Sequence, residues 1–207
     1  MAMRTPKIFC IGANKTGTTS LQRAFLDLRY SVGDQRTGEL LLQHYLNNDF
    51  GPIIEFCRSA QVFQDVPFSC PETFKYLNVA FPGSKFILSV RDSSEQWYNS
   101  IIRFHSKLFS PGRIPTAADL KNADYVYKGW MWQAFSAVHK TADTDPYNRE
   151  ALIADYERHN DSVVEYFKGR DALLVINVSE AGSYKRLCNF IGADPVYDQF
   201  PWENRTA

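Results

Sequence analysis

Four short apolar runs recur along the chain, separated by segments of helical periodicity. The runs cover Lys7 to Gly12, Gln61 to Gln64, Lys85 to Arg91 and Ala172 to Val178, and turn-forming residues bound them. Continuous apolar runs of this length are typical of parallel strands that are buried on both faces. We therefore predict a central, mainly parallel β-sheet.

Apolar side chains at helical spacing lie between these runs. A longer helical stretch, from Tyr127 to Arg170, contains a break at Asp145-Pro146, where proline ends a helix. The alternation of strands and helices predicts an α/β fold in which helices flank the sheet on both sides. The three clearest helical patterns are Leu21, Ala24, Phe25 and Leu28; Trp97, Ile101, Phe104 and Leu108; and Tyr184, Leu187, Cys188 and Ile191, followed by Gly192 at the helix end.

The length and composition favour one folded unit. The chain has 207 residues, of which 44% are hydrophobic, enough for one well-buried core. We therefore expect a single domain over residues 1–207. The stretch from Ser110 to Asp124 is rich in Pro, Gly and small residues and lies between helical segments, so we interpret it as a loop that could act as a lid.

The charge balance and the cysteines exclude several classes of protein. Lys plus Arg and Asp plus Glu both number 23, so no overall positive field recruits nucleic acid, and any anion site must be local. Four cysteines occur without metal-ligand spacing, which indicates neither a zinc site nor a disulfide framework. No apolar stretch approaches the length of a membrane span. We expect a cytoplasmic protein without a bound metal.

A glycine-bearing loop follows the first predicted strand and precedes the first predicted helix. Its sequence is Gly-Ala-Asn-Lys-Thr-Gly-Thr-Thr from Gly12 to Thr19. A strand, a loop of this kind and a helix N-terminus together direct free N–H groups and the positive end of a helix dipole at one point. The loop is therefore a candidate anion site, and its candidate ligand-binding residues are Asn14, Lys15, Thr16, Gly17, Thr18 and Thr19.

The loop differs from that of a nucleoside triphosphatase. There the second glycine is followed by a Lys that reaches the β- and γ-phosphates and a Ser or Thr that binds magnesium. In this chain Thr18 occupies the lysine position and the cation is Lys15, inside the loop. This placement favours a shorter phosphate or phosphosulfate group. The alternative is an ordinary glycine turn whose lysine faces solvent.

A second candidate anion site follows the third predicted strand. Arg91 ends the run at the sheet edge where open α/β sheets bind ligands. Ser93 and Gln96 form a capping-box pattern for the next helix, which carries Asn99 and Ser100. An Arg with a hydroxyl nearby can hold a lone phosphate, although Arg91 could also pair with a carboxylate. With the loop, this site describes a nucleoside that is phosphorylated at the 3′ and 5′ positions.

The chain resembles the P-loop sulfotransferase family over most of its length. GANKTGTTSL looks like the family's 5′-phosphosulfate loop and FPGSKFILSVRDSSEQWYNS is similar to its 3′-phosphate motif, with LLVINVSE, LCNFIG and FPWENRT as closing segments. The resemblance implies a three-layer P-loop fold and transfer of a sulfuryl group from 3′-phosphoadenosine 5′-phosphosulfate (PAPS), with release of adenosine 3′,5′-bisphosphate (PAP). Relatives usually place the 3′-phosphate serine eight residues after the arginine. That position here is Asn99, so we expect Ser100 to bind, with Asn99 as the alternative.

A base must remove the acceptor's proton during transfer. Many relatives carry a His-x-Pro whose His is the base, and here Asp65 stands in that place before Val66-Pro67. We therefore expect Lys15 and Asp65 to be the catalytic residues. Asp65 could instead cap a following turn, and His105 and His44 are alternative bases.

No motif of the chain selects one acceptor. Relatives use phenols, alcohols, amines, sugars and lipids, so a small molecule or a glycan with a hydroxyl or amine group is expected. Two other classes stay open. A P-loop nucleotide kinase or related phosphotransferase would require ATP and Mg²⁺, and a non-catalytic bisphosphonucleotide-binding protein would use Lys15 and Arg91 but tolerate loss of Asp65.

Overall fold

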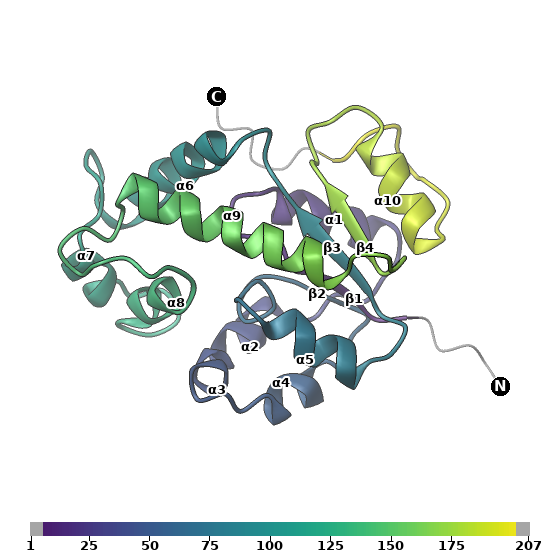
Figure 1. The fold of residues 1–207 in the computed structure, drawn as a ribbon, viewed down its shortest axis with the longest axis horizontal. Coiled ribbons are helices and arrows are strands. Elements are labelled where there is room, and N and C mark those ends of the chain that lie inside the picture. Colours follow the sequence, from purple (N-terminus) through teal and green to yellow (C-terminus); the bar gives the residue numbers. More distant parts are fainter. Residues whose placement is uncertain (1–5, 202–207) are drawn as a thin grey trace. The chain divides into compact units, whose positions relative to one another are not determined.

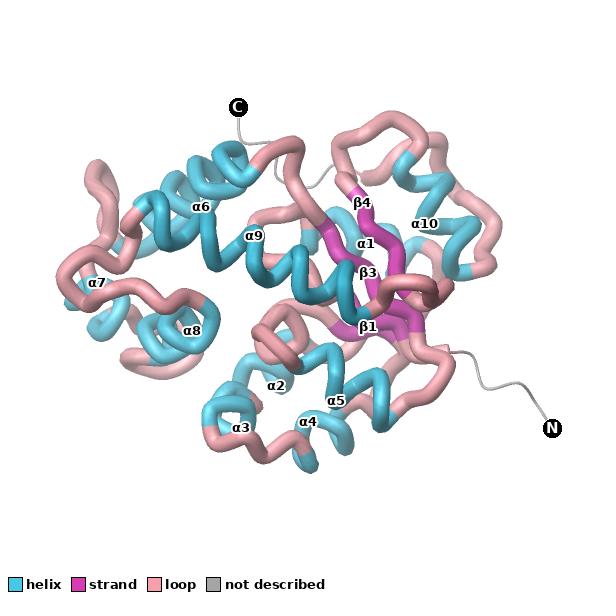
Figure 2. The backbone as a smooth tube through the Cα atoms, viewed as in Figure 1, coloured by secondary structure: helices cyan, strands magenta, loops and turns pink. Residues whose placement is uncertain are grey.

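The computed structural model describes residues 6–201, which contain one four-stranded sheet. All strand pairs are parallel, and the spatial order is β2-β1-β3-β4. Figure 2 shows the strands in magenta, with β1, β3 and β4 labelled. The strands are β1 (Ile8–Cys10), β2 (Val62–Phe63), β3 (Lys85–Ser89) and β4 (Leu173–Ile176), each inside one of the four apolar runs of the sequence.

The chain divides into two compact units, which are described separately. Unit 1 contains the sheet and is built from the residues up to Val90 and those from Val163 onward. Unit 2 runs from Arg91 to Ser162. The expectation of a single domain over 1–207 stays a prediction.

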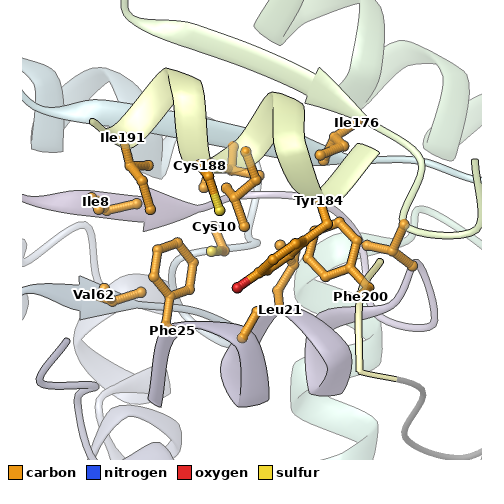
Figure 3. Close-up of a cluster of buried hydrophobic side chains, with 14 residues drawn as sticks. Ile8, Cys10, Leu21, Phe25, Val62, Ile176, Tyr184, Cys188, Ile191 and Phe200 are labelled. Atoms are coloured by element: carbon orange, nitrogen blue, oxygen red, sulfur yellow. The ribbon is translucent and has the colours of Figure 1, made fainter. Parts of the chain in front are cut away.

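Unit 1 is a three-layer arrangement (Figure 1). Side chains of β1 alternate between the two faces of the sheet, as the pleat requires. Ile8 and Cys10 enter a core formed with α1 and α10, drawn in Figure 3, whereas Phe9 and Ile11 enter a second core formed with α4, α5 and the end of α9. These two cores confirm the predicted α/β fold with helices on both faces of a parallel sheet.

Unit 1 contains six helices in its described part besides the end of α9, and some of them pack on the faces of the sheet. The left-handed glycine expected at the end of the last helix is present, because Gly192 is the C-cap residue with φ of 74°. The helices are α1 (Thr18–Asp27), α2 (Gln35–Leu40), α3 (Leu42–Leu46), α4 (Gly51–Phe56), α5 (Thr73–Ala80) and α10 (Ser183–Ile191).

Unit 2 is helical throughout its regular structure. It contains α6 (Ser94–Phe109), α7 (Ala117–Asn122), α8 (Trp130–Val138) and most of α9 (Arg149–Tyr166). The helix break predicted at Asp145-Pro146 falls in the connection between α8 and α9.

The interpretation of Ser110 to Asp124 as a loop is wrong over Ala117–Asn122, because these residues form α7. A reciprocal capping box starts this helix: Thr116 Oγ1 accepts a hydrogen bond from Asp119 N–H, and the Asp119 carboxylate accepts one from Thr116 N–H. Arg113 also pairs with Asp119 at 2.6 Å. A lid role for this segment stays a prediction.

Among the helices of residues 6–201, none combines the length and the apolar character needed to cross a lipid bilayer.

Candidate active site

The order of the strands marks one edge of the sheet as a binding edge. β1 pairs with β2 on one side and with β3 on the other, and the chain visits β2 before it crosses to β3. Open α/β sheets bind ligands beside the carboxyl ends of the strands at such a reversal. The loop that starts at Gly12 follows β1, and Ser89 ends β3, so both belong to this edge.

Glycines allow the loop to approach the neighbouring strand ends. A Cβ atom at Gly12 would lie 2.3 Å from Ser89 Oγ, and one at Gly17 would lie 2.3 Å from Val178 Cγ2. Gly17 also has φ of 100°, a left-handed conformation that favours glycine. Any larger residue at either position would push the loop away from the sheet.

Thr16 anchors the loop through its side chain. The residue is fully buried, its hydroxyl donates to Ala13 O at 2.6 Å, and Thr16 Oγ1 lies 2.6 Å from Ser89 Oγ. Because the hydroxyl is engaged inside the protein, only the backbone N–H of Thr16 remains suited to an anion. The sequence predicts Thr16 as a ligand residue but does not distinguish its hydroxyl from its backbone N–H.

The N-terminus of α1 is suited to an anion. Gly17 is the N-cap residue, so no side chain caps the helix, and the first turn contains no acidic residue. The first N–H groups of a helix have no partner inside it, and the helix dipole favours negative charge there. Of the predicted ligand residues, Asn14 and Thr19 are exposed, and Lys15, Gly17 and Thr18 are half-buried.

Lys15 itself adopts a strained backbone conformation. Its φ is 70°, in the left-handed region that non-glycine residues seldom occupy. Such outliers persist where the surrounding structure holds them, and they cluster at binding and catalytic sites. The fixed backbone conformation of the loop therefore determines the position of the Lys15 Cβ atom, from which the side chain extends.

Asp65 lies two residues after the end of β2, at the same edge of the sheet. Its backbone is also left-handed, with φ of 60°, and its carbonyl accepts a hydrogen bond from Ser69 N–H at 2.8 Å. Within residues 6–201 the Asp65 carboxylate makes no hydrogen bond or ion pair, so the alternative role as a cap is not observed. Burial raises the pKa of Asp65 to about 6; the charge of Glu39 adds to this increase and Lys15 opposes it.

Glu39 is a residue of this region that no sequence pattern indicated. It lies on α2 and is 4% exposed. Gln35 donates a hydrogen bond to its carboxylate at 3.1 Å, and Arg36 pairs with it at 3.3 Å. In the sequence Glu39 looks like an ordinary surface charge of a short polar helix, and only the folded structure shows that it is buried near Asp65.

Arg91 belongs to unit 2 and follows the end of β3 in the chain. Its backbone N–H donates to Tyr156 Oη at 3.2 Å, and Tyr156 stacks on Trp97 with ring centroids 4.5 Å apart. Burial lowers the pKa of the Arg91 guanidinium, and Tyr156 and Asp92 oppose this effect. The guanidinium stays cationic at neutral pH, because arginine side chains are not deprotonated in proteins.

The start of α6 differs slightly from the predicted capping box. Ser93 Oγ accepts a hydrogen bond from Gln96 N–H at 3.1 Å, as expected, but Gln96 Oε1 accepts from Asp92 N–H rather than from Ser93. Asn99 is exposed and Ser100 is half-buried, and neither side chain has a hydrogen-bond partner in the described part of the chain. That Asn99 or Ser100 binds a 3′-phosphate stays a prediction. It also stays a prediction that these residues and the loop bind the same nucleotide.

The two histidines considered as alternative bases both have structural partners. His105 is buried, and its Nδ1 lies 2.7 Å from Tyr147 Oη. His44 lies at the surface of unit 1, where its Nδ1 is 2.9 Å from an oxygen of Asp49. These contacts fit packing and surface roles. Asp65 therefore remains the preferred candidate.

The described residues contain no group of three or more His, Cys, Asp or Glu side chains that could hold a metal ion. The four cysteines are buried and free.

Comparison with known protein families identifies the class of protein. A family model described as a sulfotransferase domain matches residues 7–207, which is nearly the whole chain and includes both units. The chain belongs to this family of sulfotransferase domains, as the sequence motifs had suggested, and a transferase function follows. No curated protein matches the chain in a sequence search.

Proposed function

We propose that this sulfotransferase moves a sulfuryl group from PAPS to a hydroxyl or amine of a small molecule or a glycan, in the cytoplasm. The observation that carries this proposal is the anchored loop from Gly12 to Gly17, with its cation at Lys15 and an uncapped helix N-terminus beside it. This arrangement fits a 5′-phosphate without a γ-phosphate, because Thr18 stands where a triphosphatase has lysine.

In this proposal the two anionic groups of the nucleotide have separate sites. Backbone N–H groups from Thr16 to Thr19 and the Lys15 ammonium group bind the 5′ side. Arg91 binds the 3′-phosphate, with Ser100 or Asn99 as a second donor. Arg205, another candidate for the 3′-phosphate, lies outside the described residues.

PAPS supplies an activated sulfuryl group, and the protein supplies a base and stabilisation of charge. Asp65 takes the proton of the acceptor hydroxyl or amine as the bond from that atom to sulfur forms. The bond between sulfur and the 5′-phosphate oxygen breaks in the same transfer, and negative charge grows on this phosphate. Lys15 and the loop N–H groups stabilise the growing charge.

A transfer assay with labelled PAPS tests this function. Wild-type protein is incubated with ³⁵S-labelled PAPS and a panel of phenols, amino alcohols and sugars, and labelled products other than inorganic sulfate are counted. Lys15→Ala and Asp65→Asn should each lower the rate, Asp65→Asn by about 10²–10⁴-fold with nucleotide affinity nearly unchanged. A stable Asp65→Asn variant with wild-type turnover would refute the assignment of the base.

A further inference from the structure

Tyr156 of α9 contacts the first residue of unit 2. Its hydroxyl oxygen accepts a hydrogen bond from the backbone N–H of Arg91 at 3.2 Å, across 65 positions of the chain. Tyr156 is 5% exposed, so the contact is shielded from water. The hydroxyl therefore ties the backbone at Arg91 to the helix α9.

Packing within unit 2 fixes the ring of Tyr156. The ring stacks on Trp97 of α6, with centroids 4.5 Å apart and planes 8° from parallel. Trp97 is itself fully buried, and its ring centroid lies 5.8 Å from that of His139 at the end of α8. Side chains in a close-packed interior keep one orientation. The Tyr156 hydroxyl therefore has a defined position beside the Arg91 backbone.

Side chains also order the residues that follow Arg91. Asp92 N–H donates to Gln96 Oε1 at 3.0 Å, and Gln96 N–H donates to Ser93 Oγ at 3.1 Å. Together with the bond to Tyr156, these contacts hold the backbone from Arg91 to Ser93 in one conformation at the start of α6. The backbone at Arg91 determines where its side chain begins and hence where its guanidinium can reach.

We propose that Tyr156 is a positioning residue for the 3′-phosphate site: its hydroxyl holds the backbone of Arg91 in the position from which the guanidinium binds the phosphate. This inference rests on the proposed function, in which Arg91 binds the 3′-phosphate. A donor that is already held in its binding position loses less conformational entropy when the ligand binds. Tyr156 should therefore determine the preference for a 3′-phosphate rather than the affinity for every adenine nucleotide.

The variant Tyr156→Phe keeps the ring on Trp97 and removes only the hydroxyl. Calorimetry with PAP and with adenosine 5′-phosphate gives the ratio of the two affinities. This ratio should fall by about 3–10-fold in Tyr156→Phe, as expected for loss of one hydrogen bond between uncharged groups. Affinity for adenosine 5′-phosphate should stay nearly constant, because this nucleotide has no 3′-phosphate.

Tyr147→Phe is the matched control. It removes the hydroxyl of another buried tyrosine of unit 2, whose Oη lies 2.7 Å from His105 Nδ1. This variant should leave the ratio of affinities unchanged. An equal fall in Tyr147→Phe and Tyr156→Phe would show a general loss of order in unit 2 and would contradict a specific role for Tyr156.

A double-mutant cycle with Arg91→Ala distinguishes positioning from direct contact with the nucleotide. If Tyr156 acts through Arg91, then adding Tyr156→Phe to Arg91→Ala should not weaken PAP binding further. If Tyr156→Phe weakens PAP binding equally in both backgrounds, the hydroxyl acts on the phosphate by itself, and the positioning role is wrong.

Hydrogen exchange tests the contact without any nucleotide. In ¹H–¹⁵N NMR spectra the Arg91 N–H should exchange more slowly in the wild type than in Tyr156→Phe. The Gln96 N–H, which donates to Ser93, is the internal reference and should exchange alike in both proteins. Equal exchange of the Arg91 N–H in both proteins would show that the hydroxyl does not hold this part of the backbone.

Failure of this inference and failure of the proposed function give different results. A wild-type protein that does not bind PAP would contradict the proposed function, and the inference about the 3′-phosphate would fall with it. A wild type that prefers PAP, an Arg91→Ala variant that loses the preference and a Tyr156→Phe variant that keeps it in full would overturn the role of Tyr156 alone.

Discussion

Thr16 Oγ1 lies 2.6 Å from Ser89 Oγ, and this contact joins the loop after β1 to the last residue of β3. Both residues are fully buried, so the contact is shielded from water. It holds the loop in one conformation, and in the proposed function this loop binds the 5′ side of the nucleotide. A site held in its binding conformation loses less conformational entropy when the ligand arrives.

Breaking this contact should therefore affect stability and binding together. Thr16→Val keeps the shape of the side chain but removes the hydroxyl, which leaves Ser89 Oγ and Ala13 O without this partner. The free energy of unfolding should fall by about 1–3 kcal/mol. Denaturant unfolding and calorimetry with PAP measure the two effects. A variant that loses stability but binds PAP as the wild type does would show that the contact does not organise the binding site.

Lys15 should contribute to nucleotide binding without contributing to the fold. A charge-assisted hydrogen bond contributes about 1.5–3 kcal/mol, so Lys15→Ala should weaken PAP binding by about 10–150-fold. The melting temperature should stay within a few degrees of the wild type. Alanine is as strained as lysine in the left-handed conformation of this position, so the substitution relieves no backbone strain. Lys168→Ala, an exposed residue of unit 1, is the control and should bind normally.

Arg91 should determine the preference for a 3′-phosphate. In the wild type PAP should bind more tightly than adenosine 5′-phosphate, and Arg91→Ala should remove most of this preference while affinity for the monophosphate stays nearly constant. Arg103→Ala provides a control, because it removes an exposed arginine of α6. A preference that survives in Arg91→Ala would place the 3′-phosphate elsewhere. Alanine variants of Asn99 and Ser100, measured in the same way, identify the second donor.

Asp65 should make stability depend on pH in a defined direction. Its pKa is raised from an ordinary value of 3.8 to about 6, so the folded state binds this proton more tightly than the unfolded state. The protonated Asp65 carboxyl group therefore stabilises the folded state. This contribution to the free energy of unfolding is fully present below about pH 4 and is lost as the pH rises through about 6. Asp65→Asn should therefore melt higher than the wild type at pH 8 and like the wild type near pH 4. Equal melting temperatures at both pH values would contradict the raised pKa.

The strongest sequence patterns predicted their elements correctly, and the reasons are physical. All four apolar runs became strands, because a strand covered on both faces must be apolar at every position. The helices α1, α6 and α10 were found because an apolar stripe over at least two turns gives a clear period.

Short helices escaped detection. The segment from α2 to α5 contains helices of five to eight residues, too short for a period to stand out. The burial of Glu39 was missed for the same reason, since it depends on how α2 packs on the strand end. The ligand residues of the loop were proposed from sequence, but the anchoring role of Thr16 required the position of Ser89.

Calorimetry with two nucleotides tests most directly whether the protein uses PAPS as its donor. PAP is titrated into the protein in the presence of EDTA, and ATP is titrated in the presence of Mg²⁺. The proposed function predicts micromolar or tighter binding of PAP without any metal ion and much weaker binding of ATP. In this proposal Lys15 of the loop binds a short anionic group, and Arg91, which follows β3, binds a 3′-phosphate. Micromolar binding of ATP with Mg²⁺, together with no binding of PAP, would contradict a PAPS-dependent sulfotransferase and favour a phosphotransferase instead.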